Sequence, residues 1–292
     1  MSRAVAGDAR EANPAPAISA PEFALFQALI RREAGIHLSE AKKALLVGRL
    51  TRRLRELGLS SFAAYYKRVS ADPVERVLMV DRVSTNETHF FREPRQFEFL
   101  EGVVLPEWLN GPPRTVRVWS AGCSTGEEAY SVAAVLSAAL PLQRGWAIEI
   151  FGCDISTRVL ELARDARWPL EKAAEIPARY RHLYFLRGFG SQEGWMKAGP
   201  ELRTAVRFEH QSLLDNSAPV PGPFDLIFCR NVLIYFDAAT KRRVIDRLIA
   251  HLAPEGHLFL GHAESLHLLA HGMRAVGPTV YQRGERTSGR RA

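Results

Sequence analysis

Residues 116–130 read VRVWSAGCSTGEEAY, and this stretch decides the fold class of the chain. Its apolar beginning predicts a strand, its small residues predict a tight turn, and Glu127 and Glu128 then stand in the first turn of a helix that one of residues 124–126 caps. A turn without bulky side chains allows the backbone to come close to a nucleotide-like ligand. The stretch therefore predicts either a nucleotide-type ligand site or an ordinary strand–turn–helix unit of an α/β domain.

The two carboxylates narrow the class of ligand. A helix start that binds pyrophosphate would repel it with two acids, whereas an acid there suits a hydroxyl group or a cation. Asp154 follows the next expected strand, where doubly wound folds keep the acid that binds a ribose diol. A ligand with a ribose, a positive charge and no phosphate is S-adenosyl-L-methionine, with S-adenosyl-L-homocysteine as its product. The sequence leaves open whether Glu127 or Glu128 faces this cofactor, because adjacent helical residues differ by about 100°.

The alternation of elements predicts two domains. Residues 21–90 have helical periodicity without strand alternation, so we expect an N-terminal all-helical domain there. Residues 91–282 alternate between strands and helices, as in a Rossmann-like parallel sheet with helices on both faces. Short aromatic runs around glycines interrupt this pattern at about residues 176–205 and predict a small inserted antiparallel β-subdomain. We expect strands at residues 115–119, 147–152, 206–210, 224–229, 257–260 and 279–282.

Composition excludes several classes of protein. The 292 residues are enough for two domains, and no apolar run of 18 residues occurs, so we expect a cytoplasmic protein without membrane insertion. Residues 1–20 and the basic residues 283–292 are expected to be disordered tails. The three cysteines lie at the ends of apolar runs without a Cys-x-x-Cys spacing, so we expect reduced thiols and no metal site.

Basic charge is concentrated in the helical region. Residues 21–82 contain twelve Lys or Arg against seven Asp or Glu, a difference of +5. The second expected helix carries an apolar stripe, with Lys42, Arg49, Arg52 and Arg53 beside it. Because the stripe packs the domain, we expect these charges to be free to bind an acidic partner surface, the alternative being a solvated face. No nucleic-acid recognition motif is present, so we expect no nucleic-acid partner.

Three motifs resemble those of the CheR-like chemotaxis receptor methyltransferases. Residues 84–93, STNETHFFRE, resemble the signature of that family, and residues 119–128, WSAGCSTGEE, resemble its cofactor loop. Residues 229–237, CRNVLIYFD, are similar to its motif after the fourth strand of the sheet. The resemblance covers about residues 21–282 with all three motifs in order.

The resemblance implies a class I S-adenosylmethionine-dependent methyltransferase with an N-terminal helical domain and an inserted β-subdomain. It implies that the enzyme forms methyl esters on glutamate side chains of chemoreceptors, the methyl-accepting chemotaxis proteins, for sensory adaptation. The basic helix is then expected to bind the cytoplasmic domain of the receptor. In some family members the inserted subdomain holds a receptor-tail peptide by strand addition, so it is a candidate peptide site here.

The motifs also imply roles for individual residues. Arg92 and Tyr235 would lie nearest the methyl group and are the candidate catalytic residues. Glu128 would contact the amino group of the cofactor, and Asp154 its ribose. Ser212 stands where family members place an amide beside the adenine. The full set of implied cofactor-binding residues is Asn86, Thr88, Arg92, Gly122, Glu128, Asp154, Ser212, Leu213, Asn231 and Val232.

Three other functions remain to be weighed against this one. A nicotinamide oxidoreductase would carry Gly-x-Gly-x-x-Gly, but this turn offers only Gly122 and Gly126. An amine or nucleic-acid methyltransferase would carry a proline-containing loop after the fourth strand, and residues 231–235 contain no proline. A non-catalytic or differently targeted S-adenosylmethionine-binding signalling protein would keep the fold and lose cofactor or reaction residues.

Overall fold

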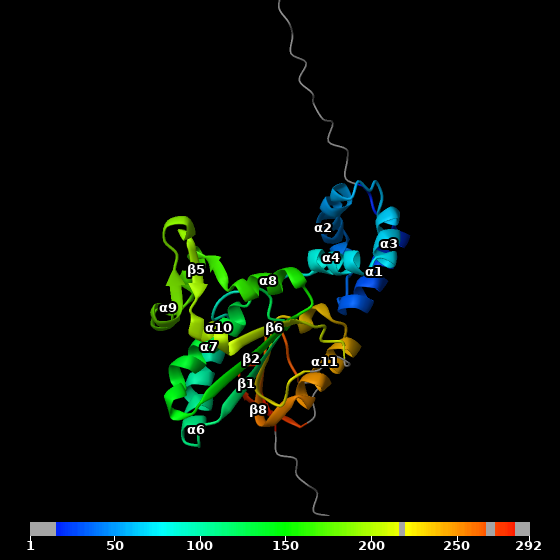
Figure 1. Ribbon diagram of the computed structural model, residues 1–292. Coiled ribbons are helices and arrows are strands. Elements are labelled where there is room, and N and C mark those ends of the chain that lie inside the picture. The colour runs from blue at the N-terminus through cyan, green and yellow to red at the C-terminus, as the bar shows by residue number, and fades with distance from the viewer. Residues whose placement is uncertain (1–15, 216–219, 267–271, 284–292) are drawn as a thin grey trace, which may run out of the picture. The chain divides into compact units, whose positions relative to one another are not determined.

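The computed structural model describes residues 16–215, 220–266 and 272–283, and the chain folds as two compact units (Figure 1). The first unit comprises Met1–Leu29 and Leu38–Val83, and the second comprises Ile30–His37 and Ser84–Ala292. Residues 84–90, which the sequence placed with the helical domain, therefore belong to the second unit. Most of the two expected tails lies outside the described residues. Within those residues, no helix has the length and apolar character needed to cross a membrane.

The first unit is helical and packs around aromatic and leucine side chains. Phe26 contacts the rings of Phe62 and Tyr65, each with a centroid separation of 6.0 Å. Ser61 caps its helix, because its hydroxyl accepts the backbone N–H of Ala64 at 3.2 Å. The helices are α1 (Ala20–Ala34), whose last turn belongs to the second unit, the short η1 (Glu40–Lys42), α2 (Lys43–Glu56), α3 (Phe62–Ala71) and α4 (Pro73–Val83).

The expectation that the arginines of α2 are free to bind a partner is wrong for two of them. Arg53 donates to both carboxylate oxygens of Glu75, at 2.8 and 2.6 Å, and the Glu75 side chain is only 2% exposed. Burial alone would raise the pKa of Glu75, but hydrogen bonds from Arg53 and Tyr65 lower it below its ordinary value. Arg49 donates to the backbone carbonyl of Val83. The apolar stripe packs α2 so that both arginines contact residues of α4, and their charges stabilise the helical unit.

Removing Arg53 should therefore destabilise the helical unit. Arg53→Ala leaves a buried carboxylate without its cation and should lower the free energy of unfolding by about 3 kcal/mol. Arg52→Ala is the matched control, because the Arg52 side chain is 83% exposed and pairs with Glu56 four residues further along the same helix; it should change stability by less than about 0.5 kcal/mol. Urea unfolding followed by circular dichroism compares the two, and equal stabilities would contradict the structural role of Arg53.

The second unit is built on a seven-stranded sheet in the order β6-β2-β1-β7-β8-β10-β9. Strands β6, β2, β1, β7 and β8 run parallel, and β10 pairs antiparallel with β8 and β9. The expected Rossmann-like sheet is thus confirmed, and β9 and β10 add an antiparallel hairpin at its edge. The strands are β1 (Thr115–Ala121), β2 (Ala147–Asp154), β6 (Val206–His210), β7 (Phe224–Cys229), β8 (Leu252–Leu260), β9 (Met273–Gly277) and β10 (Val280–Arg283).

Helices cover both faces of this sheet, with α11 on the opposite side from α7 and α10 (Figure 1). Side chains of α7 are almost all buried, because the helix packs on the sheet and on α10 at once. A separate core forms where Val244, Ile245 and Leu248 of α11 pack on Trp119 and Phe224. The helices are α5 (Pro94–Phe99), continued through the π-turn η2 (Leu100–Val104) into α6 (Leu105–Leu109), then α7 (Glu127–Ala139), η3 (Leu142–Arg144), α8 (Thr157–Asp165), α10 (Pro200–Ala205), η6 (Leu233–Tyr235) and α11 (Ala238–Ala250).

The inserted subdomain is a three-stranded antiparallel sheet in the order β3-β5-β4. The sequence predicts that this subdomain starts at about residue 176, but its first strand precedes that residue, and residues 178–184 form a helix, α9. Trp168, Tyr180 and Phe185 face the main domain and pack on Phe90 and Phe91. Its elements are β3 (Arg167–Pro169), η4 (Leu170–Glu175), α9 (Ala178–Tyr184), β4 (Phe185–Arg187), η5 (Gly190–Gln192) and β5 (Trp195–Ala198).

Candidate active site

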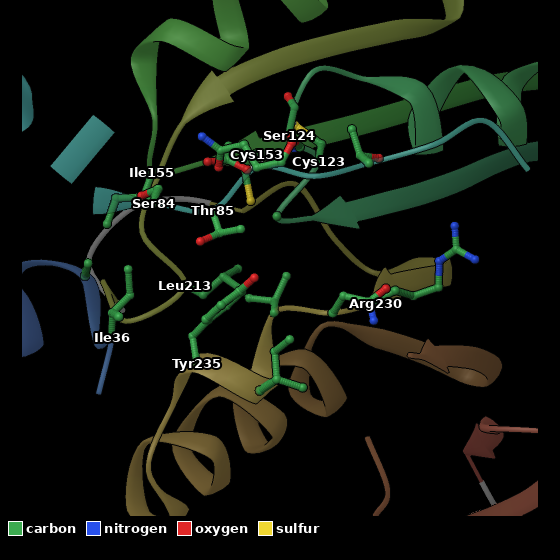
Figure 2. Close-up of a pocket in the computed structure, with 18 of the residues that line it drawn as sticks. Ile36, Ser84, Thr85, Cys123, Ser124, Cys153, Ile155, Leu213, Arg230 and Tyr235 are labelled. Atoms are coloured by element: carbon green, nitrogen blue, oxygen red, sulfur yellow. Dashed lines mark hydrogen bonds between the residues drawn. The ribbon is translucent and has the colours of Figure 1, made fainter. Parts of the chain in front are cut away.

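A cavity of about 290 Å³ lies in the second unit at the carboxyl ends of β1, β2 and β7. In open α/β sheets, ligands bind beyond these strand ends, where the strand order reverses. Figure 2 shows Cys123 and Ser124 on one side of the cavity, and Leu213 and Tyr235 on another. All eleven residues that the family resemblance implied line this one cavity: Asn86, Thr88, Arg92, Gly122, Glu128, Asp154, Ser212, Leu213, Asn231, Val232 and Tyr235.

A buried ion pair joins the walls of the cavity. Arg230, at the end of β7, donates from Nε to Glu128 Oε2 at 2.7 Å, and its side chain is 2% exposed. It also donates to the carbonyl of Arg92 and, at 3.3 Å, to Oε1 of Gln96. The hydroxyl of Ser120 donates to the other Glu128 oxygen at 2.6 Å. Three regions far apart in sequence, at residues 92–96, 120–128 and 230, are thereby fixed around one carboxylate.

The turn before α7 has the close-approach geometry that the sequence predicted, and its cap is one of the three expected residues. Gly122 has φ of 86°, and a side chain there would come within 2.5 Å of Val232 Cγ2, so only glycine fits. The helix is capped by the backbone of Gly126, at φ of 92°, with no side-chain capping bond. The turn is held against the end of β2, because the N–H groups of Gly122 and Cys123 both donate to the carbonyl of Cys153 at 2.9 Å.

Asp154 is held by the two turns that flank it. Its Oδ2 accepts the N–H of Ser124 at 2.9 Å, and its Oδ1 accepts the N–H of Ser156 at 2.9 Å. The residue is 9% exposed and lines the cavity. The two backbone bonds orient this carboxylate at the wall of the cavity. Such an acid can accept hydroxyl groups from a ligand in the cavity.

The structure separates the two adjacent acids of α7. Glu128 lines the cavity, whereas Glu127 accepts Lys172 Nζ at 2.6 Å and the Thr125 hydroxyl at 2.5 Å and is not part of the lining. The 100° step between neighbouring helical residues turns one acid toward the cavity and the other toward the inserted subdomain. Glu128 is therefore the acid that a ligand would meet.

Two asparagines present polar atoms without a partner in the described part of the chain. Asn86 Nδ2, a donor, and Asn231 Oδ1, an acceptor, are both buried, and both residues line the cavity. Buried polar groups are rarely left unpaired, so these atoms point to a ligand that accepts at one position and donates at another. The zwitterionic amino-acid end of S-adenosylmethionine offers a carboxylate and an ammonium group. The residues present therefore fit that cofactor.

The motif analysis missed Glu264, which shapes the loop after β7. Its carboxylate accepts backbone N–H groups of Gly261 at 2.7 Å, Asn231 at 2.9 Å and Ile234 at 3.3 Å. Burial raises its pKa above the ordinary value, and the backbone donors oppose that rise. These bonds hold Asn231 at a φ of 60°, which is unusual for a residue with a side chain. A sequence signal existed, since an acid follows the strand end at residue 260 in a small-residue turn.

Arg92 and Tyr235 lie at the cavity in half-buried positions. Arg92 Nη1 donates to the carbonyl of Glu87 at 3.3 Å, a long bond within its own loop. Tyr235 ends η6, and its backbone carbonyl accepts the N–H of His37. Gln211, which the motif analysis also missed, is a buried amide of the lining one position before Ser212. The structure thus places an amide in the lining directly beside Ser212.

The three cysteines are unpaired and buried, as expected. Burial raises the pKa of the Cys123 thiol well above its ordinary value and that of Cys153 to about 12. Both residues line the cavity as neutral thiols, not as nucleophiles.

Comparison with known proteins agrees with this geometry. The SAM-binding domain of the CheR methyltransferases matches residues 86–281, and their all-alpha domain matches residues 21–84. The chain is 41% identical over 260 residues to chemotaxis protein methyltransferase 2 of Pseudomonas aeruginosa, covering 89% of this chain and 92% of that one. It is 39% and 38% identical to the chemotaxis protein methyltransferases of Salmonella typhimurium and Escherichia coli, covering 91% of each chain in both comparisons. The chain therefore belongs to the CheR methyltransferase family, as an S-adenosylmethionine-dependent methyltransferase with the all-alpha and cofactor-binding domains in the family order.

Proposed function

We propose that this enzyme transfers a methyl group from S-adenosylmethionine to glutamate side chains of chemoreceptors and so forms methyl esters for sensory adaptation. One observation carries the proposal most strongly: eight residues from three separate motifs, together with Asp154, Ser212 and Leu213, line a single cavity at the ligand-binding edge of the sheet. The relatives named above are chemotaxis methyltransferases, which supports the receptor as the methyl acceptor.

Different residues of the cavity suit different parts of the cofactor. Asn86, with its unpartnered amide donor, suits the carboxylate of the methionine end, and Asn231 Oδ1 together with Glu128 suits its ammonium group. Asp154 suits the ribose hydroxyls, and Leu213 with the Gln211 amide suits the adenine. When bound, the cofactor supplies a methyl group activated by a positively charged sulfur.

Methylation of a carboxylate needs no general base. A glutamate side chain has a pKa of about 4.3, so it is already a nucleophile at neutral pH. Accordingly, none of the described residues that line the cavity is a histidine or a lysine. Oxygen attack on the methyl carbon and departure of the sulfur turn two charged groups into two neutral ones. A site that positions the carboxylate and excludes water favours this loss of charge.

Arg92 and Tyr235 are proposed to position the reacting groups. A tight ion pair between Arg92 and the acceptor carboxylate would stabilise the nucleophile and slow its attack. Arg92 therefore orients the acceptor or the carboxylate of the cofactor without fully neutralising the nucleophile. The Tyr235 hydroxyl is suited to donate to the second oxygen of the acceptor carboxylate.

The nature of the product tests the proposed reaction. Incubation with receptor-rich membranes and radiolabelled S-adenosylmethionine should place label on the receptor, and mild alkali should release that label because methyl esters hydrolyse. Alkali-stable label would identify an amine or amide product and contradict glutamate esterification. Bound cofactor without any transferred label would indicate a non-catalytic protein.

Substitution of the two positioning residues should affect turnover more than stability. Arg92→Ala and Tyr235→Phe are each expected to lower kcat for receptor methylation by at least tenfold, because each removes a donor that orients a reacting group. Thermal unfolding should stay close to that of the wild type, since both side chains are only half-buried. Wild-type rates in both variants would place the reaction centre elsewhere.

We further propose that α2 binds the methylated helices of the receptor through its solvent-exposed arginines. Arg52 and Arg55 are exposed, whereas Arg49 and Arg53 are engaged within the fold. Arg52, Arg53 and Arg82 share the carboxylate of Glu56, and Arg53 also pairs with Glu75, so three arginines stand against two carboxylates and positive charge is in excess. An acidic helix is the partner that such a face favours.

Charge reversal at the exposed pair tests this docking surface. Arg52→Glu with Arg55→Glu should raise the KM for receptor several-fold and leave the affinity for S-adenosylhomocysteine unchanged. The difference from wild type should shrink as salt is added, because surface charges are screened over about 10 Å at 0.1 M. If receptor methylation by the double variant matches that of wild type across a salt series, the face is only solvated surface.

The inserted sheet is proposed as the site for a receptor-tail peptide. Strand β4 is an edge strand, and a peptide can extend such an edge by main-chain hydrogen bonds. Large apolar side chains are exposed around it: Leu183, Leu186, Phe189 and Trp195. Phe189 is 79% exposed, which suits a partner that covers it.

A further inference from the structure

Lys172 of the inserted subdomain joins two separate walls of the cofactor cavity. Its Nζ donates to the backbone carbonyl of Thr88 at 3.0 Å and to Oε1 of Glu127 at 2.6 Å. Thr88 belongs to the segment that carries Asn86 and Arg92, and Glu127 directly precedes Glu128 in α7. One ammonium group thus links both wall segments, although Lys172 itself does not line the cavity.

Burial makes this link strong. The Glu127 side chain is 1% exposed and that of Lys172 is 25% exposed, so the pair is shielded from water. A buried carboxylate needs a cation or several hydrogen bonds, and here it has Lys172 and the hydroxyl of Thr125. The bond to Thr88 then transmits the position of α7 to the opposite segment.

Other residues of the same subdomain hold these two wall segments at second points. Glu175 Oε2 accepts the backbone N–H of Phe90 at 2.8 Å, and Trp168 Nε1 donates to the carbonyl of Thr125 at 3.2 Å. Because each wall segment has two such bonds, both its distance from the inserted subdomain and its rotation relative to that subdomain are restricted. The inserted subdomain is therefore part of the frame of the cavity.

We propose that Lys172 is a positioning residue that sets the separation between the Asn86–Arg92 segment and the start of α7, and thereby the affinity for the cofactor. The inference rests on the proposed function, in which these two walls bind the methionine end of S-adenosylmethionine. Through Lys172, the subdomain that is proposed to bind a receptor peptide also governs the cofactor site. By linkage, a peptide that shifted η4 would change cofactor affinity, and the cofactor would change peptide affinity by the same factor.

Calorimetric titration with S-adenosylhomocysteine tests this role without any methyl transfer. Lys172→Met should raise the Kd about tenfold, because a charge-assisted link between the two walls is lost. Lys172→Arg should restore the Kd to within about threefold of wild type. The matched control is Lys197→Met, because Lys197 lies in the same subdomain and pairs with the exposed Asp165 at 3.2 Å, away from the cavity; its Kd should equal that of wild type.

A double variant separates positioning from support of the fold. Glu127→Gln with Lys172→Met removes the buried carboxylate together with its cation, so it should recover stability while the Kd stays raised, since the bond to Thr88 is still missing. A wild-type Kd in the folded double variant would overturn the proposal. So would unfolding of both variants, because the ammonium would then support the whole domain. Absence of binding to the wild type would instead overturn the proposed function.

Discussion

The buried ion pair of Arg230 and Glu128 is the interaction on which the rest of the site depends. A carboxylate that is 10% exposed and a guanidinium that is 2% exposed cannot be separated without leaving a charge in the interior. The planar fork of Arg230 also reaches the carbonyl of Arg92 and the amide of Gln96, and Gln96 Nε2 in turn donates to the carbonyl of Leu260 at 2.7 Å. The ends of β7 and β8, the start of α7 and the loop before α5 are therefore positioned by one connected set of polar groups.

The segment at residues 84–93 shows how one short stretch serves two surfaces. Asn86, Thr88 and Arg92 line the cavity, whereas Phe90 and Phe91 pack against the inserted subdomain. The aromatic pair anchors the segment in a core, with ring separations of 5.0 Å from Phe90 to Trp168 and 5.3 Å from Phe91 to Tyr180. This anchoring lets polar residues between the two surfaces keep fixed positions without regular secondary structure.

The sequence predicted the elements whose cause is local and missed those whose cause is tertiary. The sequence predicts the strands at residues 206–210 and 224–229 with their exact ends, since the first alternates apolar and polar residues and the second is a largely apolar run. The turn at Gly122 was foreseen because only small residues permit it. By contrast, the sequence predicts Arg53 as a surface charge. Its partner Glu75 lies on another helix, and no pattern within α2 indicates that pairing. Glu264 and Lys172 were missed for the same reason: their partners lie on other elements.

The same distinction explains the inserted subdomain. Its glycines and aromatic residues predict a segment inserted into the strand–helix alternation of the main sheet. Strand β3 has only three residues, so the sequence shows no alternation of apolar and polar residues that would predict it. The aromatic run at residues 181–186 is interpreted from the sequence as part of an antiparallel hairpin, whereas residues 178–184 form helix α9, in which the ring of Tyr180 packs against that of Phe91. Tertiary packing overrode the β-propensity of the aromatic residues there.

The central claim is that the fork of Arg230 aligns the walls of the cofactor cavity, and calorimetric binding of S-adenosylhomocysteine to Arg230→Lys tests it most directly. Lysine keeps the positive charge beside Glu128 but cannot donate in one plane to Glu128, Arg92 and Gln96 together. We expect the variant to fold and its Kd to rise at least about tenfold. Arg242→Lys, at an exposed pair with Asp246 on α11, should bind as wild type does. A folded Arg230→Lys protein with the wild-type Kd would contradict the claim.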